Sequence, residues 1–175
     1  MKELLDLSRK TLVKHLQGEK IKPSEDIIKK YSKIQACFVT ITKNQVLRGC
    51  VGSLYARQEL WKDVVENSIN AGFKDLRFPP LRIGELDKIK IEISILSPPK
   101  KLEFRNPEEI LKKIDSNQGI ILQKRMRSAT FLPQVWEQIP SKQDFLEQLS
   151  LKAGLEEDAW KSADIWVYEV EKIKD

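Results

Sequence analysis

The sequence predicts an α+β domain with two lobes, built on a mainly antiparallel, mixed sheet flanked by helices. Segments with helical spacing and segments with strand-like alternation follow one another without the regular repeat of a parallel βα fold. The strand-like segments also come in close pairs, as hairpins do. Because 175 residues slightly exceed the commonest domain size, we assign one domain to residues 1–175.

Two helices are expected in the first 33 residues. Apolar residues recur at helical spacing from Leu4 to Leu16, and Gly18 stands where that helix would end. Residues 20–33 are polar, but Ser24 and the two acids after it are typical of a helix start. We therefore expect a second, short helix there.

The next segments predict a hairpin covered by a helix. Residues 36–42 and 46–52 are rich in β-branched and apolar types and are separated by a short polar turn. The second strand holds two glycines, which mark a bulge or a close approach to the backbone. Residues 59–73 have a helical apolar pattern, and we expect this helix to pack across the hairpin.

The middle of the chain combines a stiff loop with a clear strand. Tandem prolines within residues 73–81 end the preceding helix, since the residue before a proline is pushed out of helical geometry. Residues 88–96 alternate four isoleucines with polar residues, which is the pattern of a strand with one buried face.

The last third predicts two helices and three strands. Residues 107–114 and 141–153 are helical, the second with a serine cap and a glycine stop. An apolar run at 120–122 pairs with residues 128–133, and residues 165–170 form a closing strand.

Composition excludes several functional classes. No run approaches the roughly 18 apolar residues of a membrane span, and residues 1–4 lead into a charged amphipathic segment instead of a secretory signal, so we expect a cytoplasmic protein. Cys37, Cys50 and His15 are too few for a four-ligand zinc site, so we expect no metal and no cofactor. A formal charge of +5 permits an acidic partner without identifying one.

Four blocks of the sequence lie within about residues 36–170: LRGCVG at 47–52, FKDLRFPP at 73–80, SATFLPQVW at 128–136 and KAGL at 152–155. Together they resemble the AMMECR domain family, in which the blocks occur in the same order and which is named after a human chromosomal region linked to Alport syndrome. The sequence departs from the family signature at Val51, where isoleucine is more frequent.

This resemblance implies a fold and a set of neighbours, and it implies no particular reaction. The family is a two-lobed α/β domain of archaea, bacteria and eukaryotes, suggested to act in basic transcription, translation or replication. In prokaryotes it also occurs with Memo-type proteins and radical S-adenosylmethionine enzymes. We therefore treat residues 1–175 as a single AMMECR-type domain.

Cys50 is the first candidate catalytic residue. Arg48 is two positions away and would lower the thiol pKa, while Gly49 and Gly52 leave room for a ligand, so these three residues are candidate ligand-binding positions. The alternative is a packed, structural cysteine. Arg48 and Cys50 share one face of a regular strand, and a bulge at Gly49 would separate them.

The proline-rich block supplies a second set of candidates. Asp75 is a candidate catalytic residue and Arg77 a candidate ligand-binding residue, because the stiff segment after them would hold both in place. The alternative is an ion pair that only fixes the loop. Thr130 would add a hydroxyl to the same site, whereas Trp136 is expected in the core.

Two further pairings are open. Cys37 reaches Cys50 across the hairpin in some strand registers, which would make a redox pair. A Cys50–His15 dyad requires the first helix to fold over the site, and we expect that it does not.

The leading functional hypothesis is a pocket for a small molecule or a peptide terminus around Arg48, Cys50 and Asp75, with or without enzymatic activity. One alternative is a nucleic-acid or ribonucleoprotein accessory module that uses the basic cluster at 124–127, with the lysine pairs 100–101 and 112–113. Another is a partner or scaffold subunit for a Memo-type or radical enzyme. Nucleotide-binding loops and hydrolase elbows do not occur in the sequence, so their chemistries are not expected.

Overall fold

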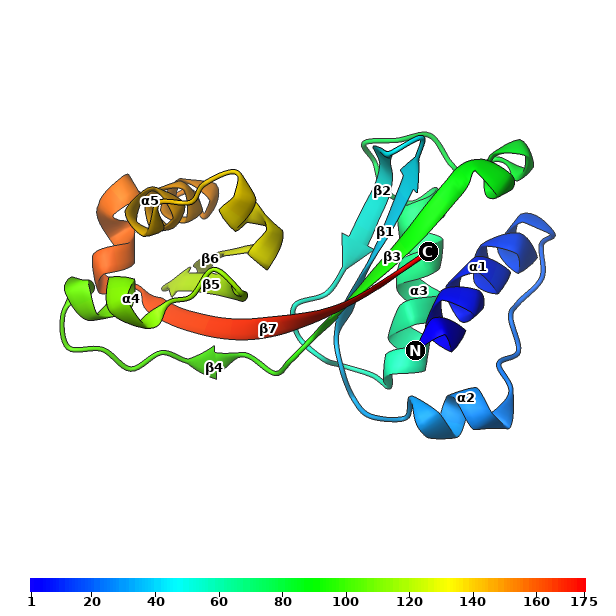
Figure 1. Cartoon of the computed structure of the whole chain (residues 1–175), viewed down its shortest axis with the longest axis horizontal. Helices are drawn as coiled ribbons and strands as arrows, with labels where there is room; N and C mark the ends of the chain where they lie inside the picture. The colour runs from blue at the N-terminus through cyan, green and yellow to red at the C-terminus, as the bar shows by residue number, and fades with distance from the viewer. The chain divides into compact units, whose positions relative to one another are not determined.

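A computed structural model describes all 175 residues and has the expected α+β composition (Figure 1). The chain forms two compact units. The first contains Met1–Leu96 together with Glu171–Asp175, and the second contains Ser97–Val170. No helix is both long enough and apolar enough to cross a membrane.

The elements follow the chain in the order that the sequence indicates, with a few short additions. The helices are α1 (Lys2–Leu16), α2 (Glu25–Lys30), α3 (Leu60–Phe73), α4 (Pro107–Lys113) and α5 (Lys142–Lys152). The strands are β1 (Cys37–Lys43), β2 (Val46–Gly52), β3 (Ile89–Leu96), β4 (Lys100–Lys101), β5 (Gln118–Lys124), β6 (Arg127–Phe131) and β7 (Asp164–Lys174). Short 3-10 helices η1 (Ile83–Lys88), η2 (Pro133–Glu137) and η3 (Glu157–Ser162) were not expected, and neither was β4.

In the first unit, β1 lies between β2 and β3, and both pairings are antiparallel. Cys37, Val39 and Ile41 of β1 have no exposed surface and belong to one core with residues of α1 and α3. The four isoleucines of β3 join this core, so the predicted buried face is confirmed. The helices therefore cover one face of this three-stranded part of the sheet (Figure 1).

The hairpin between β1 and β2 has a two-residue turn and a bulge. Asn44 and Gln45 have φ angles of 51° and 65°, as the tight turn of a twisted hairpin requires. The register then passes from Leu47 opposite Thr42 to Gly49 opposite Ile41, so Arg48 has no partner on β1. The bulge that the glycine pattern predicted is thus present, with Arg48 as the additional residue.

In the second unit, β5 pairs with β6 on one side and with β7 on the other, and β4 also pairs with β7. Trp136 stacks on Phe145 of α5 with ring centroids 3.6 Å apart, which confirms Trp136 as a core residue. Helix α5 begins where Ser141 accepts a hydrogen bond from the Asp144 N–H and ends before Gly154, whose φ is 71°. Both predicted signals of this helix are therefore confirmed.

Strand β7 is longer than the predicted closing strand and contributes to both units. Its residues up to Val170 belong to the second unit, and those from Glu171 onward belong to the first. The N–H of Asp175 donates to the carbonyl oxygen of Ile91 at 3.0 Å, and the N–H of Ile91 donates to the Asp175 carboxylate at 2.9 Å. The end of the chain thus extends the contacts of β3.

Candidate functional site

Gly49 brings α3 into direct contact with β2. A Cβ atom at this position would overlap the carbonyl oxygen of Ala71, which belongs to the α3 backbone. Gly52 is similarly constrained, because its Cβ would overlap the Cys37 carbonyl and Phe38. Both glycines therefore permit close backbone packing in the structure, and their role toward a ligand stays a prediction.

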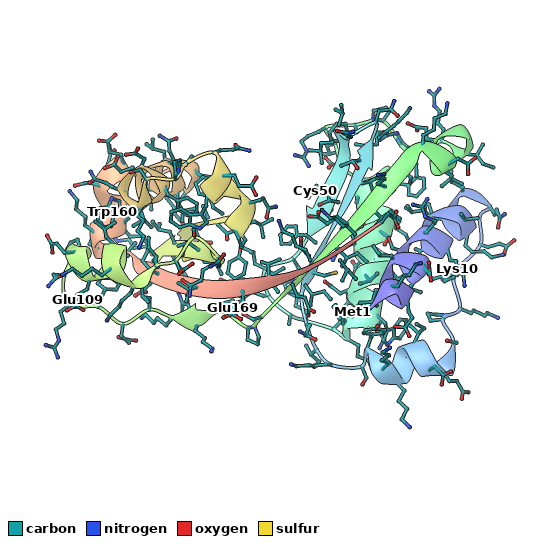
Figure 2. The ribbon with its side chains drawn as sticks, viewed as in Figure 1. Met1, Lys10, Cys50, Glu109, Trp160 and Glu169 are labelled. Atoms are coloured by element: carbon teal, nitrogen blue, oxygen red, sulfur yellow. The ribbon has the colours of Figure 1, made fainter.

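Cys50, which is labelled on β2 in Figure 2, has its side chain on the sheet face opposite the helices by strand register. Cys50 is partly exposed and pairs with Thr40, whose strand neighbours Val39 and Ile41 face the core. Successive side chains on a strand alternate between faces, so Thr40 and Cys50 point away from α1 and α3. The Thr40 hydroxyl lies 3.2 Å from the Cys50 sulfur.

Asp75 and Arg77 hold both backbone polar groups of Cys50. The N–H of Cys50 donates to Asp75 Oδ2 at 2.9 Å, and Arg77 Nη2 donates to the Cys50 carbonyl oxygen at 3.2 Å. The Asp75 carboxylate also accepts from Arg77 Nε at 2.9 Å and Nη2 at 2.7 Å. Because β2 is an edge strand, this ion pair occupies the positions that a further strand would take.

The charge of Asp75 is strongly favoured in this arrangement. Hydrogen bonds from the Arg77 side chain, and then from the N–H groups of Cys50 and Arg77, hold the pKa of the Asp75 carboxyl well below its usual range and outweigh the effect of burial. The Asp75 side chain is only 6% exposed, whereas that of Arg77 is 57% exposed. Asp75 is therefore an anchored carboxylate near neutral pH, and Arg77 keeps a surface open to solvent.

Arg48 takes part in a separate ion network around Glu85 of η1. Arg48 Nε and Nη2 donate to the two carboxylate oxygens of Glu85 at 3.1 and 3.0 Å. Lys43 Nζ donates to Glu85 Oε1 at 2.9 Å, and the backbone N–H of Arg82 donates to Oε2 at 3.0 Å. Hydrogen bonds from Arg48, and then those from Lys43 and the Arg82 backbone, lower the pKa of Glu85 to about 2.

This network lines a cavity of about 660 Å³ in the first unit. Its walls combine charged side chains, two adjacent prolines and an aliphatic residue: Lys43, Arg48, Pro79, Pro80, Arg82, Ile83, Gly84 and Glu85. Cys50, Asp75 and Arg77 are not among the lining residues. The bulge therefore separates Arg48 from Cys50: Arg48 lines the cavity, while Cys50 contacts Thr40 on the outer face.

Thr130 lies in the second unit, where its hydroxyl has local partners. It donates to the Ile120 carbonyl oxygen at 2.8 Å and lies 2.9 Å from the Tyr168 hydroxyl. The Tyr168 hydroxyl in turn donates to the Phe131 carbonyl oxygen at 3.2 Å. Burial raises the pKa of Tyr168 to about 12. Thr130 thus has a structural role inside the second unit, and its predicted role in ligand binding has no supporting contact in this network.

Cys37 and Cys50 are both free thiols on opposite faces of the hairpin. Cys37 has no exposed surface, and burial, with the nearby Asp63 carboxylate, raises its thiol pKa. Cys50 pairs with Thr40, three residues farther along β1 than Cys37. The redox-pair interpretation is therefore wrong for this register, because side chains on opposite faces cannot form a disulfide.

His15 does not approach Cys50. Its ring contacts Phe73 of α3, with centroids 4.4 Å apart, on the helical side of the sheet. The Cys50 sulfur lies on the other side, so the expectation of no Cys–His dyad is confirmed. No group of three or more histidine, cysteine, aspartate or glutamate side chains is arranged to hold a metal ion.

The basic cluster at residues 124–127 forms the turn between β5 and β6. Arg125 has a φ of 57°, and Met126 is fully exposed beside it. Lys124 Nζ donates to the Ser162 hydroxyl, and Arg127 Nη1 donates to the Gly154 carbonyl oxygen. Two of the basic side chains therefore have partners within the second unit.

Sequence reasoning missed four residues that shape these sites, namely Thr40, Lys43, Arg82 and Glu85. Thr40 was predictable in principle from hairpin register, since it faces Cys50. Glu85 and Arg82 lie outside the recognised blocks, 37 and 34 residues beyond Arg48. Only the folded structure shows that Glu85 pairs with Arg48 and that Arg82 lines the same cavity.

The chain is similar to known proteins over both of its units. The AMMECR1 family model matches residues 5–173. The Methanopyrus kandleri protein MK0488 is 39% identical over 174 residues, covering 94% of this chain and 82% of that protein. NEQ441 of Nanoarchaeum equitans is 37% identical over 171 residues, covering 95% of both. The crystal structure of the uncharacterized protein PH0010 from Pyrococcus horikoshii has a TM-score of 0.88 and 30% identity, and covers 98% of this chain and 89% of that chain.

Proposed function

We propose that this chain, which belongs to the AMMECR1 family, binds an anionic small molecule or peptide terminus in the cavity beside Arg48. The observation that carries the proposal is the charge of that cavity. Three cationic side chains, Lys43, Arg48 and Arg82, line it with one carboxylate, Glu85. A concave surface with a positive excess attracts anions and strengthens their hydrogen bonds.

The cationic side chains have different roles in this proposal. Arg48 and Lys43 already bind Glu85, so they form a fixed wall and a positive field. Arg82 binds the Glu85 carboxylate only through its backbone N–H, and its side chain is exposed. Arg82 is therefore the group that would contact the incoming anion directly, while Arg48 positions the network behind it.

Cys50 and Asp75 form a second part of the proposal. Asp75 is a positioning residue, because its carboxylate is committed to Arg77 and to the Cys50 N–H. The ion pair of Asp75 and Arg77 fixes the backbone of Cys50, whose thiol is partly exposed at the strand edge. This supports a reactive role for Cys50 and leaves the reaction unassigned. This thiol site and the anion cavity share β2 but use different surfaces.

Titration calorimetry at low ionic strength tests anion binding, with inorganic pyrophosphate and acetate as probes. We expect the wild-type chain to bind at least one probe, and Arg82→Gln to weaken binding roughly tenfold, as loss of a charge-assisted contact does. Lys88→Gln is the matched control, because Lys88 is an exposed cation at the end of η1, the 3-10 helix that follows Arg82, and lies outside the cavity. Absence of binding by the wild-type chain, or equal effects of the two variants, would overturn the proposal.

Alkylation with iodoacetamide, read by mass spectrometry, tests the thiol site. We expect Cys50 to react in the folded chain and Cys37 to react only after unfolding, because Cys37 is fully buried. Alkylated protein should keep its anion affinity within about twofold, since Cys50 does not line the cavity. Protection of Cys50, or loss of anion binding on alkylation, would contradict this division.

The two alternative functions stay predictions. A nucleic-acid module predicts RNA binding that falls steeply with salt and depends on the 124–127 cluster. A partner subunit predicts association with a purified Memo-type or radical enzyme.

A further inference from the structure

The cavity beside Arg48 has an aliphatic wall as well as a charged one. Pro79, Pro80 and Ile83 line it together with the cations. Ile83 is 72% exposed, although it stands next to polar and charged groups. Burying such a side chain against a ligand is favourable by the hydrophobic effect. The ligand that fits best therefore has an aliphatic part beside its negative charge.

The lining also argues against a nucleotide. No aromatic side chain contributes to it, so a base would have no ring on which to stack. The neighbouring Glu85 shows that a carboxylate suits the local donors: it accepts two guanidinium N–H groups, one ammonium N–H and one backbone N–H. The same chemistry, a planar carboxylate, is what Arg82 would recognise in a ligand.

Resting on the proposed anion-binding function, we propose that the ligand is the carboxy terminus of a peptide whose last residue is aliphatic. Its terminal carboxylate would bind the Arg82 guanidinium. The last side chain would lie against Ile83 and the two prolines. A volume of about 660 Å³ lies within the range of ligand sites and leaves room for preceding residues.

The rigidity of the proline wall supports a peptide end over a flexible aliphatic acid. The 79–80 proline pair restricts its own backbone and that of Phe78, so the wall is formed before binding. The loop is further fixed by the Phe78 N–H, which donates to the Asp75 carbonyl oxygen at 3.0 Å. A preformed wall reduces the entropy that binding costs, and this favours an extended segment that touches it at several points.

Calorimetry of three probes tests the inference: acetyl-Ala-Ala-Leu with a free carboxylate, the same peptide as its carboxamide, and 4-methylpentanoate. We expect the free-acid peptide to bind roughly tenfold more tightly than the carboxamide, because only the acid makes charge-assisted contacts. It should also bind more tightly than 4-methylpentanoate, which presents the same aliphatic carboxylate without a peptide backbone. Equal affinity for the two acids would replace the peptide by a small aliphatic acid and overturn the proposal.

Two variants separate this inference from the anion site itself. Ile83→Ser should weaken peptide binding several-fold and leave pyrophosphate binding unchanged, whereas Arg82→Gln should weaken both. Ile34→Ser is the control, because Ile34 is an exposed isoleucine outside the cavity. Pyrophosphate binding without a preference for the peptide acid would reject the peptide and keep the anion site. Failure of every anion to bind would reject both.

Discussion

The two units use their recognised blocks in different ways. In the first, the blocks around Cys50 and Asp75 leave a partly exposed thiol and an exposed guanidinium beside an edge strand. In the second, the hydroxyls of Thr130 and Tyr168 are hydrogen-bonded to each other and to backbone carbonyl oxygens, so both are used within the fold. Lys152, from the last block, donates to the Thr130 carbonyl oxygen and lies over the Phe131 ring.

A strand glycine in each unit makes the contrast concrete. The absence of a side chain at Gly49 leaves room for the backbone of α3, and its absence at Gly119 leaves room for the ring of Tyr168. Both are needed for packing, yet only the first stands next to a charged cavity and a partly exposed thiol. A glycine that the packing requires therefore indicates geometry alone, and a chemical role has to be inferred from the groups that stay accessible around it.

Replacing the two strand glycines should separate the units most strongly. We expect Gly49→Ala to destabilise the first unit by about 3 kcal/mol or more, because the clash involves helix backbone that cannot rotate away. Gly119→Ala should cost the second unit about 1–3 kcal/mol, since the Tyr168 ring can shift. Urea unfolding followed by ¹⁹F NMR of fluorotryptophan measures each unit, with Trp61 in the first and the other three tryptophans in the second.

Gly84→Ala is the control for the glycine pair, because open space surrounds its Cβ position. It should change stability by less than about 1 kcal/mol. A Gly49→Ala chain as stable as this control would show that α3 does not press on β2 as described.

Removing the Asp75 carboxylate should have the next largest effect. Asp75→Ala leaves the Cys50 N–H and the Arg77 guanidinium without their acceptor, and we expect the first unit to lose about 2 kcal/mol. Thermal unfolding with the same tryptophan probes measures the loss. Arg77→Ala should cost less, because it removes a largely exposed guanidinium and leaves the Asp75 carboxylate its two backbone donors, the N–H groups of residues 50 and 77. An equal loss of stability in the second unit would contradict a local effect of the Asp75–Arg77 ion pair on the first.

Acid should act on the first unit through the same carboxylates. The folded-state pKa values of Asp75 and Glu85 lie below their ordinary values of 3.8 and 4.5. Their contribution to stability is therefore complete above about pH 5 and is lost as the pH falls, for Glu85 between 4.5 and about 2. Glu85→Gln should flatten the stability profile in that window. Glu147→Gln, a change in α5 of the second unit and outside this ion network, should leave it unchanged.

The smallest expected effect is that of Thr130→Val. Loss of the hydroxyl removes one hydrogen bond to the Ile120 carbonyl and one contact with Tyr168, and should cost the second unit about 1–2 kcal/mol. Calorimetric anion binding by the first unit should not change. If Thr130→Val weakened anion binding tenfold with little loss of stability, Thr130 would be a ligand-binding residue, as its hydroxyl led us to predict from the sequence.

Local patterns were sufficient to predict most of the fold. Alternating isoleucines defined β3, the two glycines of β2 indicated a bulge, and Ser141 with Gly154 bounded α5. Each of these signals acts within a few residues of the element it specifies. The 3-10 helices and β4 have no comparable periodicity, which is why they were not predicted.

The site was less predictable because its pairings are long-range. The sequence indicated that Arg48, Cys50, Asp75 and Arg77 matter, and three of them meet at one strand edge. It did not indicate that the bulge would turn Arg48 toward Glu85. A one-residue change of register moves a side chain to another face, and composition around Arg48 does not specify that change.

Strand β7 imposes an order on how the protein can be made. Asp175 bonds to Ile91 and to Arg9, which is 166 residues earlier in the chain. A ribosome would therefore release α1, the hairpin and β3 long before the residues that complete their sheet contacts, and the whole second unit would emerge in between. The unit that begins first is the one that finishes last, so its β3 edge stays unpaired during synthesis and is open to aggregation. The opposite edge, at β2, is already occupied by Asp75 and Arg77, so only one edge of this sheet is left open in that interval.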